Sequence, residues 1–106
     1  MGMPTQPIPF RMNDANLRRL IAETAADSKR IVLLPHAREK MAERHITMRQ
    51  VIDCLLHGVV SQPAFMNIKG NWQCTLMRRN AGDEVCVVAA LEQRGNGDWV
   101  AVITTF

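Results

Sequence analysis

The sequence predicts one α+β domain, in which helices of the first half cover one face of a three- or four-stranded antiparallel sheet. The chain has 106 residues, of which 47% are hydrophobic, and this is enough for one core but not for two. Apolar residues recur at helical spacing between residues 13 and 57, whereas β-prone runs separated by turns fill residues 59–106. Helices laid on one face of such a sheet bury the apolar surfaces of both layers.

Two of the predicted helices begin at recognisable capping residues. Asn13 precedes a segment, residues 15–26, whose apolar side chains recur every three or four positions. Thr47, with Gln50 three residues later, fits a capping box and predicts a helix that ends at Gly58.

A short strand and a short helix are predicted between these two. Residues 30–34 are β-prone, and Pro35 ends the run because proline has no N–H to donate to a ladder. Residues 36–45 then form a helix in which Ala37 and Met41 share one face. An adjoining stripe, with members four residues apart, consists of His36, Lys40 and Arg44.

The second half of the chain predicts a meander of strands joined by turns that contain glycine. The strands are Val59 to Met66, Trp72 to Arg79, Val85 to Leu91 and Trp99 to Phe106. Pro63 favours an edge position for the first of them. An exposed final strand, running to Phe106, would allow edge pairing into a homodimer.

Residues 1–12 are rich in proline and are expected to be a flexible lead-in to a single domain over residues 13–106. The start lacks the charged and apolar regions of a signal peptide, and no apolar stretch reaches the roughly 18 residues that a membrane span needs. We therefore expect a cytoplasmic protein without a membrane segment.

The three cysteines, Cys54, Cys74 and Cys86, are odd in number and have apolar neighbours, which is typical of buried, reduced thiols. Cys54 and His57 lie three apart on a predicted helix and could share a metal, but two ligands are a weak signal. The sequence therefore predicts neither a metal site nor another cofactor.

The net charge of +3 is unevenly distributed. Residues 1–49 carry nine basic and five acidic side chains, a net charge of +4, whereas residues 50–106 carry four and five, a net charge of −1. The first half is therefore the expected face for an anionic partner such as nucleic acid. A solvated basic surface without a partner explains the same excess.

The run from His36 to Thr47, followed by Val51, Leu55 and Gly58-Val59, resembles a bacterial family of small uncharacterised domains. The pattern of that family is H-A-x-x-[RK]-M-x-x-R-G-I-T, a helix ending in glycine, and strands that finish in an I-T-x-aromatic tail, here residues 103–106. The resemblance covers about residues 30–106. Members of the family are similar to RelE-like and MqsR-like toxins of toxin–antitoxin modules, which implies a basic α+β protein that cleaves single-stranded messenger RNA without a metal and is held inactive by a cognate antitoxin.

The chain departs from the family pattern at three positions. Lys40 stands where arginine is usual, which keeps the charge but loses the bidentate fork. His45 stands where glycine is usual, and Phe106 stands where tyrosine is common. Because the chain has no tyrosine, a mechanism that needs a tyrosine hydroxyl is excluded.

The candidate catalytic residues follow from the needs of metal-free RNA cleavage, which are a base for the ribose 2′-hydroxyl and cations for the phosphorane. His36 is the candidate for proton transfer, because histidine titrates near neutrality and this one lies at a strand-to-helix junction. Lys40, Arg44 and Arg78 are the candidates for the phosphate. The alternatives are a structural role for His36 and a solvated stripe in which Lys40 and Arg44 pair with glutamates.

Four further residues are candidates for RNA binding. Arg38 could join the stripe or face water, and Thr104 is a polar side chain on a sheet face. Arg79 is adjacent to Arg78 on a strand, so the two point to opposite faces. Trp72 could stack on a base, or could cover the edge of the core.

The sequence leaves three functions open. The first is a toxin-like, metal-independent ribonuclease, and the second is a binding module without catalysis, which binds nucleic acid or docks on a protein. The third is a domain in which the His-Arg stripe only packs helix against sheet. Cleavage of RNA would indicate the first function, and salt-dependent binding of nucleic acid without cleavage would indicate the second. If His36→Ala lowers stability and leaves every interaction intact, the third remains.

Overall fold

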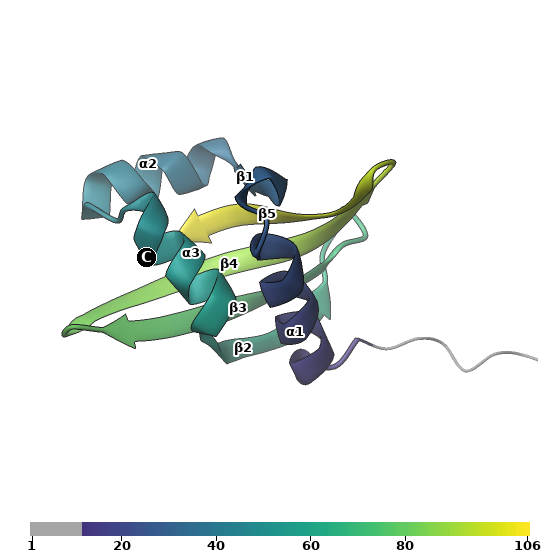
Figure 1. The fold of residues 1–106 in the computed structure, drawn as a ribbon, viewed down its shortest axis with the longest axis horizontal. Helices are drawn as coiled ribbons and strands as arrows, with labels where there is room; N and C mark the ends of the chain where they lie inside the picture. The colour runs from purple at the N-terminus through teal and green to yellow at the C-terminus, as the bar shows by residue number, and fades with distance from the viewer. Residues whose placement is uncertain (1–11) are drawn as a thin grey trace, which may run out of the picture.

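A computed structural model of the protein describes residues 12–106, which form three α-helices and a five-stranded sheet (Figure 1). The elements in chain order are α1 (Asp14–Ala25), a 3₁₀ turn η1 (Ser28–Arg30), β1 (Ile31–Leu33), α2 (Pro35–Arg44), α3 (Met48–His57), β2 (Val59–Met66), β3 (Trp72–Asn80), β4 (Asp83–Arg94) and β5 (Gly97–Thr105). The predicted α+β class is therefore confirmed. The expectation for the lead-in lies outside the described residues, except that Met12 is buried against the core.

The sheet has the order β1-β5-β4-β3-β2, and β2 to β5 form the predicted antiparallel meander. The β-prone run before Pro35 adds a fifth strand, because β1 pairs in parallel with β5, Ile31 opposite Val100. β1 occupies the outer edge of β5 at Val100 to Val102, so that part of the final strand is not free for edge pairing into a homodimer. The edges of the sheet are β1 and β2, and Pro63 lies on β2 as predicted.

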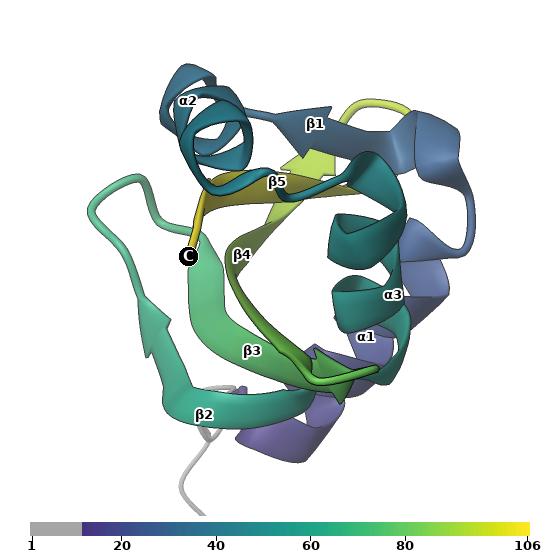
Figure 2. The same ribbon diagram turned by 90° about the vertical axis from the view of Figure 1, so that its left-hand side faces the viewer.

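The helices do not all occupy the same place on the sheet. α1 and α3 lie together against one face, whereas α2 lies along β5 beyond the end of β1 (Figures 1 and 2). The core lies between the sheet and the pair α1 and α3, with side chains from both layers fully buried. Among them are Leu17, Ile21, Val51, Leu55, Leu76, Val87, Val100 and Val102.

The opposite face of the sheet, here called the open face, is not covered by α1 or α3. Strand alternation and register place Gln73, Thr75, Ala90, Ala101 and Thr104 on this face. The open face is flanked by α2 on one side and by the turn between β2 and β3 on the other (Figure 2).

Local sequence explains where the helices begin. The Asn13 side chain accepts a hydrogen bond from the Asn16 N–H (2.8 Å), as expected of an N-cap. Thr47 and Gln50 form both bonds of the predicted capping box. Pro35 is in the first turn of α2, where its missing N–H leaves no helical bond unmade.

Helix α1 is also bonded to β2 and to the residue that precedes it. The Asp14 carboxylate accepts a hydrogen bond from the Ala64 N–H (2.7 Å), and the Arg18 Nε donates to the Gly58 carbonyl (2.7 Å). These two bonds join α1 to the edge strand that follows α3.

Cys54 and Cys74 are buried, as predicted, whereas Cys86 is half-buried. Burial, as the largest cause, raises the pKa of Cys54 to about 12 and that of Cys74 to about 11. Both side chains therefore pack as neutral thiols at physiological pH.

No helix within residues 12–106 is long and apolar enough to cross a membrane.

Candidate functional site

The packing of α2 decides which of its side chains reach solvent. Ala37 is fully buried and Met41 is packed against the core, which turns the rest of the helix outward. His36 Nδ1 lies 3.7 Å from the Glu39 carboxylate, an ion pair when the imidazole is protonated, and Lys40 Nζ lies 3.3 Å from Glu43. Of these pairs, only Lys40–Glu43 belongs to the solvated-stripe alternative.

Arg44, at the C-terminal end of the same stripe, is exposed. It makes no ion pair within the described part of the chain. Its guanidinium is therefore the member of the stripe that is most readily available to an anionic ligand.

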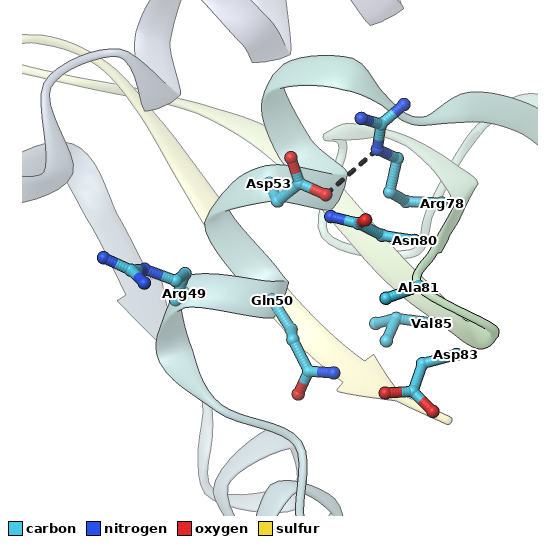
Figure 3. A pocket seen from close by; sticks show the side chains of 8 residues that line it. All are labelled: Arg49, Gln50, Asp53, Arg78, Asn80, Ala81, Asp83 and Val85. Carbon is cyan, nitrogen blue, oxygen red and sulfur yellow. Dashed lines mark hydrogen bonds and ion pairs between the residues drawn. The ribbon is translucent and has the colours of Figure 1, made fainter.

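A hollow of about 290 Å³, here called the hairpin hollow, lies between α3 and the turn that joins β3 to β4 (Figure 3). It is lined by Arg49, Gln50, Asp53, Arg78, Asn80, Ala81, Asp83 and Val85. Arg78 Nε donates to Asp53 Oδ2 (3.0 Å) at one end, and the Arg49 side chain points away from the hairpin (Figure 3). Arg44 lines an adjoining hollow that shares Gln50, Asp83 and Val85 with this one.

A second hollow, of about 190 Å³, lies on the open face and is here called the sheet hollow. It is lined by Leu34, Asn67, Ile68, Lys69, Asn71, Gln73, Ala90, Glu92, Ala101 and Ile103. Because α2 begins at Pro35, directly after Leu34, its first turn lies beside this hollow. The turn between β2 and β3 contributes Asn67, Ile68 and Lys69 to this lining.

The structure brings only part of the predicted catalytic set together. Arg44 and Arg78 reach neighbouring hollows. His36 is at the other end of α2, about 12 Å from Arg44 along the helix axis for a rise of about 1.5 Å per residue. The stripe thus begins close to Leu34 of the sheet hollow and ends at the hollow that adjoins the hairpin hollow, and His36 lines no hollow in common with Arg78.

The four candidates for RNA binding lie on different surfaces. Arg38 Nε donates to the Leu33 carbonyl (3.3 Å), and Arg79 pairs with Glu84 (2.8 Å), which raises the pKa of Arg79. Trp72 packs against the core from the helix-covered face, as the structural alternative for it predicted. Thr104 is on the open face, so these residues share no single surface.

Sequence reasoning missed the polar residues of the sheet hollow. Lys69 and Asn71 belong to a segment that was interpreted only as a turn, and Gln73 follows it on β3. The available signal was the density of amide side chains at Asn67, Asn71 and Gln73, but their convergence depends on two strands far along the chain.

The backbone at His45 explains why glycine is usual at this position of the family pattern. His45 ends α2 in the left-handed conformation (φ 55°), and the next N–H, of Ile46, donates to the Met41 carbonyl (2.9 Å). This position favours glycine, because a Cβ costs roughly 1–2 kcal/mol there.

We expect His45→Gly to raise the free energy of unfolding by about 0.5–1 kcal/mol, because relief of the left-handed strain exceeds the extra freedom that glycine gains in the unfolded chain. Urea denaturation measures this change. Ala42→Gly, at an exposed position inside the same helix, is the matched control and should lower stability by about 1 kcal/mol. A loss of stability in both variants would contradict the left-handed end of α2.

Within residues 12–106, no group of three or more His, Cys, Asp or Glu side chains is placed to hold a metal ion. A family model described as a domain of unknown function (DUF4258) matches residues 33–106, and this range contains α2, α3, β2 to β5 and both hollows. No curated protein and no solved structure matches the chain. Because the match extends over more than half of its residues, the chain belongs to the DUF4258 family.

Proposed function

We propose that this protein is a toxin-like, metal-independent endoribonuclease that acts on single-stranded messenger RNA and is controlled by a cognate antitoxin protein. The proposal rests mainly on one observation. The basic stripe His36, Lys40 and Arg44 runs along the outside of α2, from a point two residues after Leu34 in the sheet hollow to the hollow that adjoins the hairpin hollow. The motif resemblance of the same segment to families related to RelE-like and MqsR-like toxins adds the reaction class.

In this proposal the two ends of α2 have different roles. His36 takes the proton of the ribose 2′-hydroxyl, and the 2′-oxygen attacks the adjacent phosphorus. The bond from phosphorus to the 5′-oxygen breaks, and the 5′-oxygen leaves with a proton from solvent water. Lys40 binds the attacked phosphate, and Arg44 holds a neighbouring phosphate of the same strand. The Nε of Arg78 is already bonded to Asp53, so Arg78 offers only its remaining N–H groups to the RNA strand beyond Arg44.

The experiment is incubation of the purified protein with mixed-sequence single-stranded RNA in EDTA at low salt. We expect products that end in a 2′,3′-cyclic phosphate, and a rate about 10²–10⁴-fold lower for His36→Ala, which is the usual contribution of general acid–base catalysis. His57→Ala replaces an exposed histidine at the end of α3 and should leave the rate unchanged. Equal rates for the three proteins would remove His36 from the reaction.

A non-catalytic binding module is the second candidate, and a specific observation favours it. His36 and Arg78 do not meet, and His36 and Lys40 each lie beside a glutamate. In that case RNA stays intact but binds, and Arg44→Ala should reduce the slope of log K against log salt by about 0.7 for the lost phosphate contact. Intact RNA without binding would leave docking on a protein as the remaining function.

A further inference from the structure

The sheet hollow has a flat, apolar floor. Ala90 and Ala101 are direct partners across β4 and β5, and their small side chains leave room above the strands. Leu34 and Ile103 continue this apolar surface, and Ile68 stands fully exposed at its rim. At about 190 Å³ the hollow is smaller than the roughly 300–1,000 Å³ typical of sites for drug-sized ligands, so it suits a single ring system.

The polar atoms at the edge of the sheet hollow are mostly donors. Asn67 Nδ2 donates to Gln73 Oε1 (3.0 Å), which leaves the Gln73 amino group as the free end of that amide. The Asn67 Oδ1 accepts from the N–H groups of Lys69 and Asn71 (3.0 Å each), and these bonds hold the turn in place. Lys69 Nζ forms no ion pair or hydrogen bond with any residue from 12 to 106.

One acceptor at the edge of the hollow is already in use. Glu92 Oε1 accepts two hydrogen bonds from Arg94, at 3.3 and 2.8 Å. A ligand that reaches the hollow therefore meets an apolar floor and the N–H groups of Gln73 and Lys69. An anion such as a phosphate gains little from the floor, whereas a flat ring with acceptor atoms on its edge satisfies both parts of the site.

We infer that the sheet hollow binds one unpaired nucleobase, and that it prefers bases with a ring carbonyl oxygen, which are uracil, cytosine and guanine, over adenine. The source of the base follows from the proposed function, on which this inference rests. A base in the hollow lies beside Leu34, so the backbone of the same strand can continue along α2 past His36. Unpaired bases that are bound by their faces and edges are the usual basis of single-stranded RNA recognition.

The test uses nucleosides, which carry a base but no phosphate. Uridine and adenosine are titrated into the full chain, and the side-chain amide signals of Gln73 and Asn71 are followed by ¹H–¹⁵N NMR. We expect both signals to move with uridine, and uridine to bind at least threefold more tightly than adenosine.

Gln73→Glu is the decisive variant. The carboxylate keeps the acceptor for Asn67 Nδ2 but replaces the free donor by an acceptor, so uridine should bind at least tenfold more weakly. Gln62→Glu is the matched control, because Gln62 is on the same face, does not line the hollow, and accepts a bond from Thr75 Oγ1 that a carboxylate also accepts. It should change uridine binding by less than twofold. Lys69→Gln, on the exposed turn, is a second variant that should weaken uridine binding if Gln73→Glu does not fold.

Two results would overturn the inference. One is the absence of any shift at Gln73 and Asn71 with both nucleosides, and the other is an equal effect of Gln73→Glu and Gln62→Glu. These failures are separate from a failure of the proposed function. A protein that cleaves RNA but ignores nucleosides keeps the ribonuclease proposal and loses this one, whereas uridine binding with intact RNA does the reverse.

Discussion

Gly58→Ala should lower the free energy of unfolding by about 3 kcal/mol, at the upper end of the range for overpacking. A Cβ at Gly58 would lie 2.5 Å from the Cys54 carbonyl oxygen, 3.1 Å from that of Met77 and 3.2 Å from the Cys54 Sγ. Two of these three atoms are backbone, so no side-chain rotation relieves the clash. The Cys54 carbonyl also accepts the Gly58 N–H (2.8 Å), and a shift that makes room for the Cβ lengthens that bond.

Urea denaturation of both proteins measures the effect of Gly58→Ala, and Gly95→Ala is its control. A Cβ at Gly95 meets no atom within 4 Å, so that variant should be as stable as the wild type to within about 0.5 kcal/mol. Equal stabilities for the two variants would mean that the Cys54 and Met77 carbonyls do not approach position 58 as closely as described.

Leu76→Ala should destabilise the protein by about 2–5 kcal/mol, the usual cost of removing a fully buried leucine side chain. Leu76 is 0% exposed and lies at the centre of β3, with Val87 and Val60 as its partners on the neighbouring strands. Because β3 is held between β2 and β4, the strand has little freedom to collapse into the cavity.

The control for Leu76→Ala is the next residue along β3. Met77 is half-buried on the open face, so Met77→Ala should cost less than half as much in the same denaturation experiment. A shift of one residue in the register of β3 would exchange the faces of the two side chains. The opposite order of the two losses would therefore show that the strand is out of register.

The parts of the fold that depend on neighbouring residues were predictable. Asn13, Thr47 and Gln50 cap their helices as expected, because a cap is a bond across three residues. The capping box is likewise complete between Thr47 and Gln50, with both of its bonds formed. Each of these signals is complete within a few positions of the sequence.

The parts that depend on distant residues were not predictable. β1 has only three residues, and its partner strand begins more than 60 positions later, so nothing local marks it as a parallel edge strand. Gly58 was predicted as a helix end for its conformational freedom, yet its φ is −66°, and the close approach of Cys54 and Met77 is what requires glycine. Only the folded chain brings these groups together.

The same limit applies to the candidate site. The stripe on α2 was visible from the spacing of its residues, but its two ends face hollows that other strands build. The Asp53–Arg78 bond joins residues 25 positions apart, and the sheet hollow joins Leu34 to residues of β3, β4 and β5. A motif can therefore indicate the chemistry of its own segment without indicating which distant residues complete the site.

The bonds from α1 to β2 have a consequence for the limits of the domain. The family model matches from residue 33 onward. Asp14 nevertheless binds a backbone N–H within β2, and Arg18 binds the carbonyl just before it. Leu17 and Ile21 fill the core above the sheet. A fragment cut at the start of the match would expose that apolar surface and free the edge strand for pairing with other chains. The described fold thus extends beyond the family match on its N-terminal side, and we expect removal of α1 to promote aggregation.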